Sequence, residues 1–442
     1  MKRLVILGAA ESGVGAAILG AKKGYEVFVS DAGAIKDKYK AMLAAHSLRW
    51  EEGTHTEAEI LRATEVIKSP GIPDNAPMIV KLRAAGIPVI SDIEFASRYT
   101  AAKMICITGS NGKTTTTSLV YHILQKAGLD VGLAGNIGRS FALQVAEGER
   151  DYYVLELSSF QLDDMYDFRA HVAVLLNITP DHLDRYDYDM QKYTDSKMRI
   201  TRNQTADDTF IYWNEDPVVS VELPKYPLAA RRLAFTDLDL TTAAAYSDGR
   251  ALHTQAGFTM PLDKVLIKGR HNVRNALAAI LAAQAAGVSD KSIADGLYTF
   301  TGVEHRLEPV RTVDGVSYIN DSKATNVDAC YYALDSMTAP TVLIIGGKDK
   351  GNDYNEIKEL VRKKCRAIVY LGADNAKLHA FFAPLGLPTA DTHSMPECIE
   401  ACRRLAHSGD TVLLSPCCAS FDLFRNMEDR GEQFKTLVRA LP

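Results

Sequence analysis

The sequence has no apolar run long enough to cross a membrane, which takes about 18 to 20 residues. This absence excludes a membrane-spanning helix. Residues 1–24 start with basic and then apolar residues, as a signal peptide does, but Glu11 and several glycines interrupt the apolar stretch. A strand, a tight turn and a helix account for this segment better than a cleaved leader. Tandem repeats and low-complexity segments are also missing, which excludes a repeat architecture.

The seven cysteines include no Cys-x-x-Cys pair, and their number is odd. These features argue against a disulfide framework and a zinc site, and they favour buried, reduced thiols in a cytoplasmic protein. A basic excess is missing as well, because the net charge is −5 with 24% charged residues. A general nucleic-acid-binding protein would normally show a concentrated basic face. Small anionic substrates stay compatible with this composition, since a local basic cleft can lie inside an acidic protein.

What the sequence does have is a repeated alternation of short apolar strands and helical segments. Such alternation predicts parallel sheets covered by helices. With 442 residues the chain is long for a single core, so we expect two or three domains. We predict an α/β protein with a Rossmann-like N-terminal domain at 1–93, a central domain with a mostly parallel sheet at 94–302, and a Rossmann-like C-terminal domain at 303–442. Shorter strand-like pieces at 231–260 indicate an antiparallel addition to the central sheet.

The N-terminal segment carries a loop that is similar to a dinucleotide-binding loop but departs from it. Residues 8–13 follow a predicted strand and open a helix, and Gly8 and Gly13 fit the pattern G-x-G-x-x-G. Ala10 takes the place of the middle glycine, which normally lets a pyrophosphate approach the backbone. Asp31 ends the next predicted strand, where an acid that binds a ribose belongs. A nicotinamide dinucleotide is therefore disfavoured, while another diphosphate-bearing ligand or a purely structural turn stays open.

The strongest signal is the stretch ITGSNGKTTTTSLV at residues 107–120. It resembles a phosphate-binding loop, but the usual pattern G-x-x-x-x-G-K-[ST] requires a glycine five residues before Gly112, where this chain has Ile107. The backbone N–H groups of the loop are expected to surround phosphate oxygens. Lys113 would neutralise phosphate charge, and the Thr114 hydroxyl would bind Mg²⁺. The central domain is therefore predicted to be a P-loop ATPase domain.

Further polar residues follow predicted strands and helices of the central domain. Glu156 ends an apolar strand, which is where a second acid usually reaches the metal in such folds. A polar cluster follows the next buried strand and comprises Asp181, His182, Asp184 and Arg185. Its position at the end of a core strand favours a functional role for His182. Lys197 lies on a predicted helix and, taken alone, is typical of a solvated surface lysine.

Together these motifs resemble those of the Mur ligase superfamily, the ATP-dependent amide ligases of peptidoglycan synthesis. Its phosphate loop has the short form G-x-x-G-K-[ST], which residues 109–114 match. The resemblance covers nearly the whole chain, through GNIG (135–138), ELSSFQL (156–162), NITPDHLDRY (177–186), HNVRNA (271–276), HR (305–306), NDSKATN (320–326) and SPCCASFD (415–422). With SPG at 69–71 and GGKDKGNDY at 346–354, the chain is most similar to the members that join D-glutamate to UDP-N-acetylmuramoyl-L-alanine.

The resemblance implies that the first domain binds the UDP part of the substrate, that the second binds ATP, and that the third binds D-glutamate and completes the ATP site. The positions implied at the UDP-linked substrate are Ser12, Asp31, Ser69, Pro70, Gly71, Asn136 and His182. Those implied at ATP are Gly109, Ser110, Asn111, Gly112, Lys113, Thr114, Thr115, Asn275, Arg306 and Asp321. Those implied at D-glutamate are Lys323, Thr325, Lys350 and Ser420.

The resemblance also implies a reaction and two Mg²⁺ ions. Its catalytic residues would be Lys113, His182, Lys197 and Lys323, and its metal ligands Thr114, Glu156, His182 and Lys197. Lys197 matches a lysine that reacts with CO₂ in this family, and the resulting carbamate is an anion with two oxygens suited to Mg²⁺. ATP would convert the substrate's carboxylate into an acyl phosphate, which the amine of D-glutamate attacks. His182 cannot easily be both metal ligand and base, so the base is left unassigned.

The sequence departs from the family pattern at Ala10, Glu11 and Met427. We expect the Glu11 carboxylate to turn away from a bound diphosphate, and Met427 to change the wall of a pocket. The rival hypotheses are another amide ligase of the superfamily, a nucleotide-dependent switch protein and an NAD-dependent oxidoreductase. The first domain argues against a folate polyglutamylating enzyme, and the missing N-K-x-D motif argues against a guanine-nucleotide switch. We expect a monomer that binds neither nucleic acid nor membranes.

Overall fold

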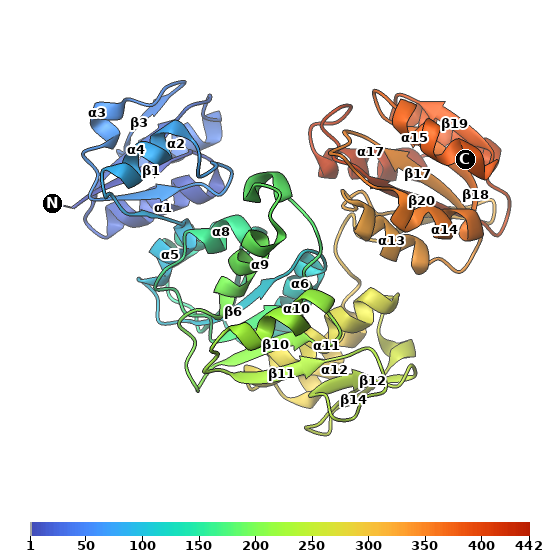
Figure 1. The fold of residues 1–442 in the computed structure, drawn as a ribbon, viewed down its shortest axis with the longest axis horizontal. Helices are drawn as coiled ribbons and strands as arrows, with labels where there is room; N and C mark the ends of the chain where they lie inside the picture. Colours follow the sequence, from blue (N-terminus) through green and yellow to red (C-terminus); the bar gives the residue numbers. More distant parts are fainter. Residues whose placement is uncertain (1) are drawn as a thin grey trace. The chain divides into compact units, whose positions relative to one another are not determined.

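The structure is a computed structural model and describes residues 2–442. The chain divides into two compact units (Figure 1). The first comprises Met1–Val265 with Arg274–Phe300, and the second Leu266–Val273 with Thr301–Pro442. Within residues 2–442, no helix is both long enough and apolar enough to cross a bilayer.

The first sheet of unit one is parallel throughout and has the order β3-β2-β1-β4-β5. Its strands are β1 (Arg3–Leu7), β2 (Glu26–Asp31), β3 (Arg49–Glu52), β4 (Glu65–Lys68) and β5 (Val89–Ile90). The helices that follow them are α1 (Glu11–Lys22), α2 (Asp37–Ala45), α3 (Glu57–Ile60), α4 (Pro77–Ala84) and α5 (Asp92–Ser97). The strand order reverses at β1, which has β2 on one side and β4 on the other. The carboxyl ends of these three strands therefore lie at the switch point of the strand order, which is where ligands bind in such sheets.

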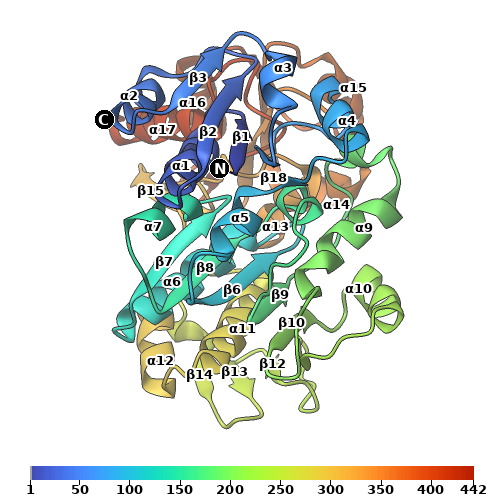
Figure 2. The same ribbon diagram turned by 90° about the vertical axis from the view of Figure 1, so that its left-hand side faces the viewer.

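The second sheet of unit one has the order β14-β13-β12-β11-β10-β9-β6-β8-β7 (Figure 2). Its strands are β6 (Lys103–Thr108), β7 (Val131–Gly135), β8 (Tyr152–Glu156), β9 (Val172–Leu175), β10 (Thr209–Trp213), β11 (Arg231–Phe235), β12 (Ala245–Ser247), β13 (Ala251–Thr254) and β14 (Thr259–Pro261). β6, β8 and β9 are interior strands of this sheet and are almost entirely buried, as their apolar sequences predict. β13 pairs antiparallel with β12 and β14, which confirms the predicted antiparallel addition for this part of residues 231–260. β11, in the same range, pairs parallel with β10 and β12, so the prediction is wrong there.

Helices cover this second sheet. They are α6 (Lys113–Lys126), α7 (Phe141–Glu147), α8 (Ser159–Asp163), α9 (Met190–Met198), α10 (Pro217–Glu222), α11 (Arg270–Ala285) and α12 (Asp290–Thr299). Short 3₁₀ turns at Leu183–Tyr186 and Arg199–Thr201 flank α9. A serine caps α8 at its start, where Ser158 and Gln161 bond each other's backbone in a capping box.

The two sheets of unit one are joined by close helix packing and by buried charges. α1 packs on α7, and a Cβ added at Gly15 would lie only 2.1 Å from Ser140 Oγ. Lys68, at the end of β4, forms a 2.8 Å ion pair with Asp164 after α8, and both side chains are only 2% exposed. Because a buried charge without its partner is strongly destabilising, this pair fixes the loop after β4 against the second sheet.

The sheet of unit two has the order β15-β16-β20-β17-β18-β19 and is parallel except for the pairing of β15 with β16. Its strands are β15 (Glu308–Val313), β16 (Val316–Asn320), β17 (Thr341–Gly346), β18 (Cys365–Leu371), β19 (Thr389–Thr392) and β20 (Thr411–Cys417). Its helices are α13 (Val327–Asp335), α14 (Asn355–Lys364), α15 (Ala376–Phe382), α16 (Met395–Leu405) and α17 (Met427–Arg439). Alternate residues of β17 point into two separate cores: Val342 and Ile344 into one, Leu343 and Ile345 into the other.

The predicted fold class is confirmed: the chain has three separate α/β sheets, of which the first is parallel and the others mostly parallel. The seven cysteines are buried free thiols. The boundaries at 93 and 302 stay a prediction.

Candidate active site

The phosphate loop connects β6 to α6 and is held by the segment that follows β9. The backbone N–H of Ser110 donates to the carbonyl of Asn177 at 2.9 Å, and that of Asn111 donates to Asn177 Oδ1 at 2.8 Å. Ser110 Oγ donates to the carbonyl of Thr179 at 2.8 Å and lies 3.0 Å from the Tyr193 hydroxyl. The shape of the loop is therefore set by groups outside it.

Gly112 closes the loop just before α6 begins. Its φ of 85° lies in the left-handed region that favours glycine. A Cβ at this position would lie 2.5 Å from Oδ1 of Asn275, a buried residue of α11. The fold thus brings together two predicted ATP-binding positions that are far apart in the sequence.

Two lysine side chains of this site contact the same backbone carbonyl. Lys113 Nζ donates to the carbonyls of Gly109 at 2.9 Å and Ser110 at 2.8 Å. Lys197 Nζ donates to the carbonyl of Gly109, also at 2.9 Å. Helix α9 places Lys197 in the interior, where it is 2% exposed and its Nζ lies 4.7 Å from the ring centre of Tyr193. The expectation of a surface lysine, made from the residue alone, is wrong.

Burial lowers the pKa of Lys197 well below that of a free lysine, and the positive charge of Lys113 lowers it further. The carboxylates of Asp181, Asp163 and Glu156 act in the opposite direction but more weakly. Lys197 is therefore close enough to Lys113, Asp181 and Glu156 to interact with each of them electrostatically. A lowered pKa favours the neutral amine, which is the form that acts as a nucleophile.

Glu156 ends β8 next to this group and is 1% exposed. Its Oε1 accepts a hydrogen bond from Asn136 Nδ2 at 2.8 Å, and its backbone carbonyl accepts one from the Asn136 N–H at 2.8 Å. Its Oε2 is buried and has no hydrogen-bond partner among residues 2–442. A buried carboxylate oxygen without a partner is unfavourable unless it binds a cation or an ordered water, so Glu156 fits the requirements of a metal ligand.

His182 lies in the loop after β9, and its side chain is 46% exposed. Its ring meets the ring of Phe160 edge to face, with 5.3 Å between ring centres, and its Nε2 lies 3.6 Å from Asp181 Oδ2. Phe160 belongs to α8, which follows Glu156. The imidazole is thus placed near the end of β8, where the predicted metal ligand Glu156 lies.

The predicted residues of the first sheet lie at the carboxyl ends of β1, β2 and β4. Oδ2 of Asp31 accepts a hydrogen bond from the N–H of Ala9 at 2.7 Å, and its Oδ1 accepts one from Gly33 at 2.8 Å. Ser69 Oγ lies 3.4 Å from the carbonyl of Gly8. Asp31 therefore stabilises the loop after β1 through its hydrogen bond to Ala9.

The remaining residues of this group follow the same strands. Ser12 lies in the first turn of α1, next to Glu11, whose Oε2 accepts a hydrogen bond from the Tyr39 hydroxyl at 3.3 Å. The Nη atoms of Arg185 lie 3.4 to 3.5 Å from the carbonyls of Pro70, Gly71 and Ile72. Arg185 thereby links the loop after β4 to the polar cluster of the second sheet.

The predicted residues of unit two follow β16, β17 and β20, except Arg306, which precedes β15. Asp321 is fully buried after β16, where its Oδ2 accepts a hydrogen bond from Ser415 Oγ at 3.0 Å and its Oδ1 accepts one from the N–H of Leu307 at 3.2 Å. Arg306 Nη1 lies 3.7 Å from Asp321 Oδ1. Two further predicted ATP-binding positions are therefore in contact with each other.

The predicted D-glutamate-binding residues lie in neighbouring loops of unit two. Lys323 and Thr325 continue the loop that starts at Asp321, and the N–H of Thr325 donates to the Lys323 carbonyl at 2.9 Å. The loops that contain the exposed Lys350 and the buried Ser420 meet where Lys348 pairs with Ala419. Met427 starts α17, and its carbonyl accepts a hydrogen bond from Ser322 Oγ at 2.7 Å.

The buried carboxyl group of Asp321 makes stability depend on pH. Loss of hydration raises its pKa from 3.8 to about 6, against the opposing effect of Arg306. The folded chain therefore holds this proton more tightly than the unfolded chain. The contribution of this proton to the free energy of unfolding is fully present below pH 3.8 and is lost as the pH rises through about 6.

Replacing Asp321 by asparagine is expected to stabilise the free protein by up to about 3 kcal/mol at pH 7.5 and by much less near pH 4. The amide oxygen accepts from the Leu307 N–H, the amide NH₂ donates to Ser415 Oγ in place of accepting from it, and the side chain carries no charge to desolvate. Thermal unfolding at several pH values between 4 and 8 measures the effect. The matched control is Asp335→Asn, at an exposed position in the same unit. A gain in Tm that is the same at every pH would contradict the explanation.

Sequence reasoning missed two residues that hold the site together. Asn177 supports both Ser110 and Asn111, and Tyr193 contacts Ser110 while covering the amine of Lys197. Asn177 had a detectable signal, because it lies directly after a buried strand. Tyr193 had none, since one tyrosine on an amphipathic helix is more often a core residue.

Three segments of the chain match known domain families. Residues 4–78 match the MurD N-terminal domain, residues 107–283 the Mur ligase middle domain, and residues 305–418 the Mur ligase glutamate ligase domain. A solved structure of UDP-N-acetylmuramate-alanine ligase from Thermotoga maritima has a TM-score of 0.64 and 18% identity, with full coverage of both chains. At this identity the likeness concerns the fold, which is that of a Mur ligase.

Two curated relatives are much more similar in sequence. The UDP-N-acetylmuramoylalanine–D-glutamate ligase of Bacteroides thetaiotaomicron is 61% identical, with 100% of both chains covered. The protein of the same name from Porphyromonas gingivalis is 54% identical, covering 99% of this chain and 98% of its own. The chain therefore belongs to the Mur ligase family, in the branch of the UDP-N-acetylmuramoylalanine–D-glutamate ligases.

Proposed function

We propose that this chain joins D-glutamate to UDP-N-acetylmuramoyl-L-alanine in peptidoglycan precursor synthesis and converts ATP to ADP and phosphate. The observation that carries the proposal is the meeting of Lys113 and Lys197 at the Gly109 carbonyl, beside the unpartnered Oε2 of Glu156. This group of charges suits a triphosphate, a metal ion and a second anion. The named relatives supply the identity of the two co-substrates.

The chemistry begins with a carboxylate, which resists attack by an amine because it is negatively charged. An oxygen of the substrate's terminal carboxylate attacks the γ-phosphorus of ATP, and the bond from that phosphorus to ADP breaks. The product is an acyl phosphate. The amine of D-glutamate then attacks the acyl carbon and loses a proton, and inorganic phosphate leaves with the oxygen that came from the carboxylate.

The residues of the phosphate loop act mainly by positioning and by charge stabilisation. Two negative charges 4 Å apart repel by about 4 kcal/mol at an effective dielectric constant of 20. The N–H groups of residues 109–113 and the ammonium of Lys113 offset this repulsion around the phosphates. Lys323, in unit two, is proposed to do the same at the reacting acyl phosphate.

The donor set of unit one fits Mg²⁺, which prefers oxygen ligands. Thr114 and Glu156 would hold one ion, and His182 and the carbamate of Lys197 a second. When bound, the ions neutralise phosphate and carboxylate charge. The unpartnered Oε2 of Glu156 supports this assignment, because its burial without a cation is unfavourable.

The carbamate of Lys197 would form when its neutral amine attacks CO₂ and releases one proton. Full burial next to Lys113 favours the neutral amine, and it also provides a positive partner for the resulting anion. Lys197 would thereby change from a buried neutral amine at the Gly109 carbonyl into an anionic metal ligand.

The UDP part of the substrate is assigned to the carboxyl ends of β1, β2 and β4, with Ser12, Asp31 and the loop 69–71. Asn136 and His182 would contact its muramoyl part. D-glutamate is assigned to Lys323, Thr325, Lys350 and Ser420 in unit two. We further propose that the chain acts in the cytoplasm as a monomer.

Phosphate release by the purified protein tests this function. We expect release from ATP only when UDP-N-acetylmuramoyl-L-alanine and an amino acid are both present. In a panel of D- and L-amino acids, D-glutamate should give the highest rate. Release with ATP alone would indicate a different class of ATPase, and a preference for another amino acid would indicate another amide ligase.

A further inference from the structure

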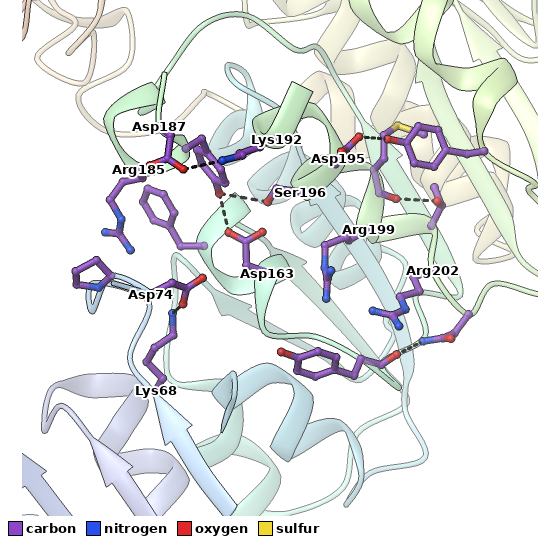
Figure 3. Close-up of a pocket in the computed structure, with 18 of the residues that line it drawn as sticks. Lys68, Asp74, Asp163, Arg185, Asp187, Lys192, Asp195, Ser196, Arg199 and Arg202 are labelled. Carbon is purple, nitrogen blue, oxygen red and sulfur yellow. Dashed lines mark hydrogen bonds and ion pairs between the residues drawn. The ribbon is translucent and has the colours of Figure 1, made fainter. Parts of the chain in front are cut away.

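Unit one contains a cavity of about 970 Å³ that includes none of the predicted catalytic residues (Figure 3). Its wall is formed by the end of β4 and the loop after it, by α8, by the exposed side of α9 and by residues 199–204 and 226–229. This volume is at the upper end of the range of small-molecule sites, and it is large enough for a metabolite of nucleotide size.

Helix α9 separates this cavity from the phosphate loop. Asp195, Ser196 and Arg199 face the cavity, whereas Tyr193 and Lys197 contact Ser110 and Gly109 on the other side. The spacing of a helix explains the division, since successive residues point about 100° apart. The cavity is therefore a separate space, although its occupant would contact the helix that carries Lys197.

The carboxylates that line the cavity mostly have partners. Asp74 pairs with Lys68 and Arg83, and Asp187 pairs with Lys192. Asp163 accepts a hydrogen bond from the Tyr186 hydroxyl at 2.8 Å, and Asp195 accepts one from the Tyr226 hydroxyl at 2.5 Å. Asp184 is exposed. The pairs of Asp74 with Lys68 and of Asp187 with Lys192 are drawn as dashed lines in Figure 3.

Three guanidinium groups that line the same cavity have no carboxylate within ion-pair distance in the part of the chain that the structure describes: Arg185, Arg199 and Arg202. Arg185 lies over the ring of Phe160 at 4.3 Å. Arg199 donates only to the carbonyls of Leu162 and Met165.

Arg202 has no side-chain hydrogen bond to any of residues 2–442, and its guanidinium lies 5.9 Å from the ring centre of Tyr166. The guanidinium of Arg199 lies 5.6 Å from the same ring. Figure 3 shows Arg199 and Arg202 next to each other and pointing in the same direction, with Arg185 across the cavity. The ring of Tyr166 thus lies near two guanidinium groups that form no ion pair with a carboxylate in the described residues, although Asp163 is close enough to Arg199 to interact with it electrostatically. The Arg202 side chain is exposed.

We propose that this cavity is a second anion-binding site, whose ligand is a small, multiply charged metabolite with phosphate or carboxylate groups. Guanidinium groups bind both kinds of oxyanion through paired hydrogen bonds. Arg199 and Arg202 would form the main contact, and Arg185 would reach the far end of the ligand. Because the three arginines lie outside the predicted ATP-binding and metal-binding residues, the proposal does not depend on the ligase reaction.

Isothermal titration calorimetry on the full chain tests this site, with inorganic pyrophosphate as the phosphate probe and citrate as the carboxylate probe. Lys113→Ala serves as the background because it weakens binding at the phosphate loop. In this background, adding Arg202→Gln should raise the Kd of at least one probe tenfold or more. The matched change Arg250→Gln, at an exposed arginine of unit one outside the cavity, should alter the Kd less than twofold.

The probe whose Kd responds to Arg202→Gln shows whether the site prefers phosphate or carboxylate groups. A response of either probe supports the site. Equal Kd values in the Arg202→Gln and Arg250→Gln proteins, for both probes, would overturn the proposal. So would the absence of any binding to the Lys113→Ala protein. None of these measurements requires turnover, so they remain informative even if the proposed ligase activity were not found.

Discussion

Replacing Lys113 by alanine is expected to lower kcat for amide formation by at least about a thousandfold, since removing one preorganised charge from a phosphoryl-transfer site has effects of this order. In the structure the Lys113 ammonium lies against the carbonyls of Gly109 and Ser110. From there it can reach phosphate oxygens bound by the loop. Steady-state phosphate release with all three substrates measures the loss.

The matched control for this prediction is Lys126→Ala. Lys126 lies on the same helix but is exposed in its last turn. We expect it to change kcat by less than twofold, and both variants should keep the circular dichroism spectrum of the original protein. Full activity of the Lys113→Ala protein would contradict the assignment of this loop to the triphosphate.

Replacing Lys197 by arginine is expected to reduce kcat by about a thousandfold as well, because the guanidinium keeps its proton and cannot form a carbamate. Replacing it by methionine should give the same loss of activity but a different effect on stability. A buried amine is unfavourable and a thioether is not, so the Lys197→Met protein should unfold at the same or a higher temperature. Activity would thus be lost without a loss of stability.

The carbamate itself can be observed by ¹³C NMR after incubation with ¹³C-labelled bicarbonate. We expect one protected carbamate resonance in the original protein and none in the Lys197→Met protein. Lys192→Met is the control, because Lys192 is exposed on the same helix and is paired with Asp187. A resonance that persists in the Lys197→Met protein would place the carbamate elsewhere, and unchanged activity would remove Lys197 from the mechanism.

Much of the fold could be predicted because strands and helices are indicated by patterns within short stretches of the sequence. Apolar runs such as residues 103–108 and 172–175 predict buried strands, and the helical segments between them predict parallel pairing. The position of Glu156 at the carboxyl end of an apolar strand also follows from this pattern. Residues at strand ends are therefore the part of a site that periodicity can locate.

The environment of each side chain could not be predicted in the same way. Lys197 has the local sequence of a surface lysine, and only the packing of α9 against the phosphate loop buries it. The pair of Lys68 with Asp164 joins segments that lie far apart in the chain, and neither residue belongs to a motif. Such contacts depend on tertiary packing, which a single sequence does not display.

The central claim is that ATP activates the substrate's carboxylate before the amide forms. The most direct test uses UDP-N-acetylmuramoyl-L-alanine with ¹⁸O in its terminal carboxylate, together with ATP and D-glutamate. If an acyl phosphate forms, one labelled oxygen should appear in inorganic phosphate for each amide made. Phosphate without the label, released as the amide forms, would contradict the mechanism.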